Sequence, residues 1–105
     1  MKARFIHNGA PIDYIPTTDV AAGSVVVHGD LVGITKLNIK ANSLGALHVV
    51  GVYDVEKGNL AFALGAKVYW STTTNSVTAT ATDTLLGIAV QEAVVGDEFV
   101  RVRIN

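Results

Sequence analysis

The three histidines are the side chains of this sequence best suited to metal binding or proton transfer, but their spacing keeps them apart. No two of His7, His28 and His48 have the i,i+2 spacing of one strand face or the i,i+4 spacing of one helix face, which ligands on a single element need. The chain has no cysteine, so thiolate ligands, a nucleophilic thiol and disulfide bonds are excluded. We therefore predict no metal site and expect the histidines at exposed strand ends.

The adjacent carboxylates Asp97 and Glu98 are the next candidates for chemistry. They follow Gly96, which favours a turn, and neighbouring residues of a strand point to opposite faces, so the two carboxylates do not converge on one atom. The sequence contains neither the Gly-x-Ser-x-Gly elbow of a serine hydrolase nor a glycine-rich phosphate-binding motif. We predict no catalytic residues, no cofactor and no enzymatic activity.

Composition narrows the classes of partner. The chain has 105 residues and a net charge of −1, with no run of lysine or arginine, which argues against nucleic-acid binding. It lacks the apolar stretch of a signal peptide or membrane span, so we expect no membrane contact. The absence of cysteine fits synthesis in a cytosol. Half of the residues are hydrophobic, an excess for so small a core that predicts burial of apolar surface in a homo-oligomer.

Glycines and prolines divide the chain into short β-branched runs, the pattern of many strands joined by tight turns. One turn of helix is slightly favoured over a strand at Leu60–Leu64, and no long amphipathic helical pattern occurs. We predict an all-β fold with at most that one helical turn. The expected strands cover residues 24–28, 31–36, 46–55, 66–71, 77–82, 85–93 and 98–104.

A sequence motif occurs twice in the expected strands. Leu31–Ile34 (LVGI) returns as Leu85–Ile88 (LLGI), and each copy follows a glycine-led strand and precedes a glycine turn and a further strand. Two pseudo-repeats, residues 23–55 and 65–104, would then pack as a small antiparallel barrel or sandwich within a single domain, 1–105. Gly33 and Gly87 should hold equivalent positions where a neighbour leaves no room for a side chain.

The last expected strand has two distinct faces. Its aliphatic residues, which should face the core, are Val100, Val102 and Ile104. Phe99, Arg101 and Arg103 point the other way. Arginine and aromatic residues are enriched at interfaces, so these three are candidate contacts with a partner protein or another subunit, the alternative being a solvated face.

Residues 1–16 lie outside both repeats and form an N-terminal arm or hairpin. Prolines and a glycine turn set this segment apart, as expected of an arm. As an arm it would contribute more to partner binding than to folding, with Phe5 and Tyr14 as further candidate contacts. As an edge hairpin it would place the same two residues in the core.

With the strands laid out, the chain resembles the capsid cement, or head decoration, proteins of tailed bacteriophages and prophages. The most specific strings are Gly65–Trp70 (GAKVYW), Leu86–Ala89 (LGIA) and Val100–Asn105 (VRVRIN). The resemblance implies a structural virion protein, made in the host cytoplasm, that binds the major capsid protein on the outer surface of the mature head and stabilises it. By analogy with the lambda head decoration protein, it also implies a homotrimer.

A carbohydrate- or surface-binding β module of the fibre or adhesin type is the alternative function. It would require exposed aromatic side chains, such as Tyr53, Tyr69 or Trp70, in a shallow groove. Trp70 shares the face of Val68 and is expected in the core, with Tyr69 facing out.

Overall fold

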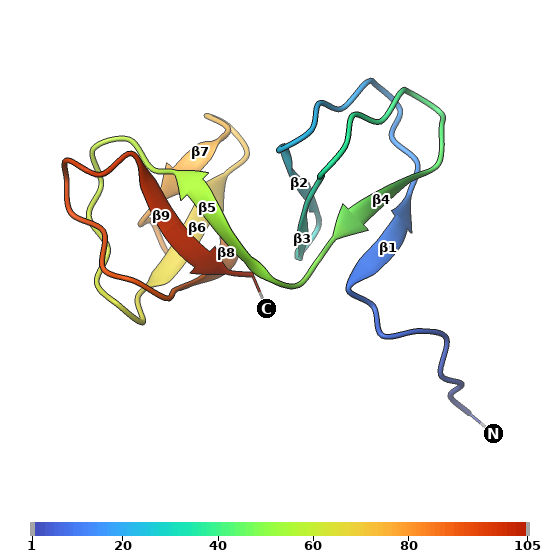
Figure 1. Cartoon of the computed structure of the whole chain (residues 1–105), viewed down its shortest axis with the longest axis horizontal. Helices are drawn as coiled ribbons and strands as arrows, with labels where there is room; N and C mark the ends of the chain where they lie inside the picture. The colour runs from blue at the N-terminus through green and yellow to red at the C-terminus, as the bar shows by residue number, and fades with distance from the viewer. Residues whose placement is uncertain (1, 105) are drawn as a thin grey trace.

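The computed structural model describes residues 2–104, so the two terminal residues of the predicted domain 1–105 lie outside the described residues. Within that range it contains nine strands and no helix (Figure 1). The strands are β1 (Pro11–Tyr14), β2 (Val25–His28), β3 (Leu31–Ile34), β4 (Gly45–His48), β5 (Val52–Glu56), β6 (Lys67–Ser71), β7 (Ser76–Thr78), β8 (Thr84–Ala89) and β9 (Phe99–Arg103). The all-β prediction is confirmed.

The strands form two antiparallel sheets that are not closed into a barrel. The first sheet has the order β1-β4-β3-β2, and the second has the order β5-β9-β8-β6-β7. The expected strand over residues 46–55 is divided between them, because the chain leaves the first sheet after β4 and enters the second at β5. Gly51, with φ of 125°, lies at this crossing and adopts a conformation that few other residues tolerate.

The two sheets share one pattern of backbone hydrogen bonds. The N–H of Gly23 donates to the carbonyl of Thr35 at 2.7 Å, and the N–H of Gly65 donates to that of Ala89 at the same distance. Matching isolated bridges join Val20 to Ile39 and Phe62 to Ala93. In this correspondence β1, β2, β3 and β4 match β5, β6, β8 and β9, and β7 is additional.

This correspondence bears on where the two predicted units begin and end. Because β1 pairs within the first sheet and β5 within the second, we propose that the repeated units are residues 11–49 and 52–104 instead of 23–55 and 65–104. The helical turn favoured at Leu60–Leu64 is not formed, since Phe62 pairs with Ala93 across the corresponding bridge.

Gly33 and Gly87 are closely covered by the neighbouring strand, as predicted. A Cβ at Gly33 would overlap the Leu47 side chain, and a Cβ at Gly87 would overlap the carbonyl oxygen of Arg103 and the Val102 side chain. Leu47 and Val102 occupy matching places in β4 and β9, each one residue before the partner of the β3 or β8 isoleucine. Both glycines therefore allow close packing between strands.

The main core joins the two sheets. Val32 and Ile34 of β3 belong to the same buried cluster as the inner face of the second sheet, and Trp70 packs against it half-buried. The other buried members come from β5 to β9 and from the segments that adjoin these strands: Val55, Phe62, Val68, Val77, Leu86, Ala89, Ala93, Val100, Val102 and Ile104. One buried cluster therefore contains residues of both sheets.

Candidate functional site

The outer face of β9 carries the three candidate contact residues of the last strand. Phe99, Arg101 and Arg103 are exposed, while Val100 and Val102 between them are fully buried, as the alternation predicts. The neighbouring strand β5 places Asp54 directly opposite Arg101. The structure thus brings an aromatic ring, two guanidinium groups and a carboxylate onto one solvent-facing surface.

Arg101 and Asp54 form a two-pronged ion pair. Arg101 Nε donates to Asp54 Oδ1 at 2.9 Å, and Nη2 donates to Oδ2 at 3.2 Å. This hydrogen bonding lowers the pKa of the Asp54 carboxyl; partial burial opposes the shift, and the arginine charge adds to it. An exposed pair of this kind adds little stability, so its main effect is to hold the guanidinium in one orientation.

The two N-terminal candidates lie elsewhere. Residues 2–9 form no strand and extend away from β1 (Figure 1), and the side chain of Phe5 is 78% exposed. Tyr14 is half-buried in β1, opposite Gly45 of β4. The predicted segment 1–16 therefore contains both an extended arm and an ordinary edge strand, and neither lies on the β9 surface.

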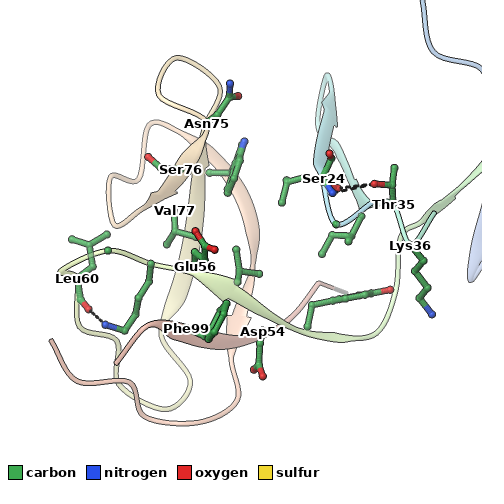
Figure 2. Close-up of a pocket in the computed structure, with 18 residues that line it drawn as sticks. Ser24, Thr35, Lys36, Asp54, Glu56, Leu60, Asn75, Ser76, Val77 and Phe99 are labelled. Carbon is green, nitrogen blue, oxygen red and sulfur yellow. Dashed lines mark hydrogen bonds between the residues drawn. The ribbon is translucent and has the colours of Figure 1, made fainter. Parts of the chain in front are cut away.

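An open groove between the two sheets was not predicted from the sequence. It has a volume of about 1030 Å³ and receives side chains from both sheets (Figure 2). Its apolar lining includes Val25, Ile34, Tyr53 and Trp70. These residues come from strands far apart in the chain, so only the tertiary arrangement reveals the groove.

Two polar side chains of the groove are engaged within the protein. Lys57 is only 3% exposed, and its Nζ donates to the carbonyls of Leu60 at 2.5 Å and Val94 at 2.6 Å. The hydroxyl of Tyr53 donates to the carbonyl of Val50 at 3.2 Å, and burial raises the pKa of this phenol. Both polar groups therefore stabilise loops and are already hydrogen-bonded within the protein, while the ring of Tyr53 still lines the groove.

The histidines are dispersed in the structure. His7 Nδ1 accepts the N–H of Gly9 at 2.9 Å, His28 is exposed at the end of β2, and His48 is half-buried in β4. Across residues 2–104, no three side chains among histidine, cysteine, aspartate and glutamate gather as metal ligands would. The same residues include no helix of the length and apolarity that crossing a membrane requires.

Comparison with known proteins supplies the assignment that the geometry alone does not. The sequence model of phage cement proteins matches residues 6–104. The chain belongs to the phage cement protein family. Searches of curated proteins and of solved structures gave no match.

The match to phage cement proteins covers both sheets and confirms the resemblance seen in the sequence. A cement protein has a structural role in a phage capsid, within the virion, and the family implies no catalytic one. The outer face of β9 (Phe99, Arg101 and Arg103) lies within the matched residues, and the N-terminal arm (residues 2–9) overlaps their start. These two surfaces are the candidate contacts of this cement protein.

Proposed function

We propose that the protein binds the major capsid protein on the outer surface of the mature head and stabilises that head as a homotrimer. The match of residues 6–104 to phage cement proteins is the observation that carries this proposal. Binding that favours the expanded shell over its precursor stabilises the shell by mass action, without any chemical step.

The β9 surface is the contact with the capsid that best fits this function. Phe99 offers an exposed apolar ring, and Arg101 is held in place by Asp54 instead of being free to rotate. Ordered arginines and aromatic rings contribute strongly to interfaces because little conformational entropy is lost when they bind. The proposed capsid contact therefore consists of Phe99, Arg101 and Arg103.

Substitution on this surface tests the proposal. We expect the double variant Phe99→Ala/Arg103→Ala to bind expanded, undecorated heads at least roughly tenfold more weakly in co-sedimentation, since it removes two central contacts. Thr73→Ala, at the exposed turn between β6 and β7, is the control and should bind normally. All variants should keep the wild-type melting temperature within a few degrees. Undiminished binding of the double variant would exclude Phe99 and Arg103 as capsid contacts.

The arm gives a separate prediction. Removing residues 2–9 should preserve the cooperative melt, because these residues pair with no strand, but should weaken head binding, because an extended arm can add a strand to a capsid-protein sheet. A protein starting at Thr17 is the contrasting variant. It also loses β1, which pairs with β4 at four positions, and it should fold poorly. Full head binding without residues 2–9 would remove the arm and Phe5 from the contact.

The groove supports the carbohydrate-binding module as a second candidate function. Tyr53 and Trp70 line the groove and Phe99 lies at its margin, giving the aromatic surface on which sugars stack. A glycan array read with wild type and Trp70→Ala distinguishes the functions. Head binding without glycan binding supports the cement function, and specific glycan binding lost in Trp70→Ala supports the alternative.

A further inference from the structure

Two corresponding connections of the fold carry opposite charges and exposed apolar side chains. The first joins β3 to β4 through residues 35–44, and the second joins β8 to β9 through residues 90–98. They correspond because each contains the second member of a matching bridge, Ile39 in one and Ala93 in the other. The first connection carries lysines and the second carries carboxylates, so the two connections are complementary in charge.

The first connection forms one side of an apolar pocket with a basic lining. The pocket has a volume of about 610 Å³, and at its mouth Leu37 and Leu44 are 77% and 65% exposed. Its charged or titratable lining residues are Lys36, Lys40 and His48.

The pocket has no acidic lining residue, and residues 31–53 contain no aspartate or glutamate. Two carboxylates lie nearby. Asp19 Oδ1 accepts the N–H of Ala41, and Asp13 is opposite Ala46 on β1. We refer to this surface, centred on Leu37 and Leu44, as the basic pocket.

The second connection is an acidic, apolar projection. Val94 and Val95 are exposed at its tip, next to Glu92, Asp97 and Glu98. No lysine, arginine or histidine occurs anywhere between residues 68 and 100. We refer to residues 92–98 as the acidic loop.

The acidic loop is held in shape from within. Asp97 Oδ2 accepts the N–H of Val94 at 2.9 Å, which closes the turn. Beneath it, the buried Nζ of Lys57 donates to the carbonyl of the same valine. A loop fixed in this way loses little conformational entropy when it binds.

Residues 37–44 of the first connection and residues 92–98 of the second lie on far sides of the molecule from each other (Figure 1), so the two connections meet only between copies. We propose that the acidic loop of one copy inserts Val94 and Val95 into the basic pocket of the next copy. The contact rests on the homo-oligomer proposed above and specifies its interface. Because two different surfaces meet, the contact is heterologous and must close into a ring if it is not to form a filament.

Cysteine cross-linking tests this contact, because the natural chain has no cysteine to interfere. Leu44→Cys and Val95→Cys proteins, mixed under mild oxidation, should form a disulfide-linked dimer in much higher yield than Leu44→Cys mixed with Thr73→Cys. A single chain carrying both Leu44→Cys and Val95→Cys should form a ladder on a non-reducing gel that ends at the closed trimer. Both experiments are run in solution and on decorated heads.

Charge-reversal variants test whether the cross-linking yield depends on attraction between the basic pocket and the acidic loop. Lys40→Glu in the Leu44→Cys protein should reduce cross-linking by at least roughly threefold, and Glu98→Lys in the Val95→Cys partner should restore it. Equal yields from the Val95 and Thr73 pairs, both in solution and on heads, would overturn the proposed contact. If native mass spectrometry still showed trimers, the homotrimer would stand and only this interface would be wrong.

Cross-linking of Leu44→Cys to the capsid protein alone would also overturn the contact, because it would assign the basic pocket to the capsid protein.

Discussion

Replacing Gly87 with alanine should destabilise the protein by at least about 3 kcal/mol, which is enough to unfold much of a small domain. The added Cβ would overlap the carbonyl oxygen of Arg103, and a backbone atom cannot move without breaking the pairing of β8 with β9. Urea denaturation followed by circular dichroism measures the loss as a lower midpoint.

Alanine substitutions at two other glycines provide the comparison for the stability loss at Gly87. Gly33→Ala should cost less, because the atoms nearest its Cβ belong to the side chain of Leu47 and not to the backbone, although Leu47 is itself buried. Gly96→Ala should lie within about 0.5 kcal/mol of wild type, since nothing approaches its Cβ and its φ is not positive. If Gly87→Ala unfolded at the same urea concentration as Gly96→Ala, the close approach of β8 and β9 at this position would be refuted.

Replacing Lys57 with methionine should cost about 2–4 kcal/mol, because the carbonyls of Leu60 and Val94 would lose their shared donor while remaining largely desolvated. The loss is limited because methionine fills similar space and removes a buried charge. Thermal unfolding measures it, and limited proteolysis near Val94 should become faster as the loop loosens.

Lys67→Met is the matched control for this substitution. Lys67 is exposed on β6 and makes no ion pair with any residue from 2 to 104, so its replacement should change the melting temperature little. Equal stability of the Lys57 and Lys67 variants would show that water replaces the buried ammonium group at both carbonyls.

The sequence predicts those parts of the fold in which local pattern and tertiary environment agree. Strict alternation identified the buried face of β9, and the repeated Leu-x-Gly-Ile motif identified two glycines that the structure finds tightly packed. The exposed placement of Phe99, Arg101 and Arg103 followed from the same alternation. Their role as capsid contacts remains a proposal, because exposure does not identify what binds.

The end of β7 and the burial of Lys57 could not be predicted, because side-chain bonds and tertiary contacts override the local sequence pattern there. Alternation over residues 77–82 predicted a long strand, but β7 ends at Thr78, because its hydroxyl bonds to Asp83 and accepts the N–H of Thr80. These side-chain bonds compete with strand pairing and turn the chain. Lys57 stands in a sequence typical of a surface turn, and its burial arises only when residues near position 94 fold over it.

The strand order also constrains the sequence of events as the protein is synthesised. All four strands of the first sheet lie between Pro11 and His48, so they can pair while the rest of the chain is still being translated. The second sheet cannot, because β9, which follows its other strands in the chain, lies between β5 and β8. Until β9 has been synthesised, β5 and β8 keep the backbone N–H and C=O groups of their β9-facing edges unpaired, and the second half is the part more exposed to misfolding.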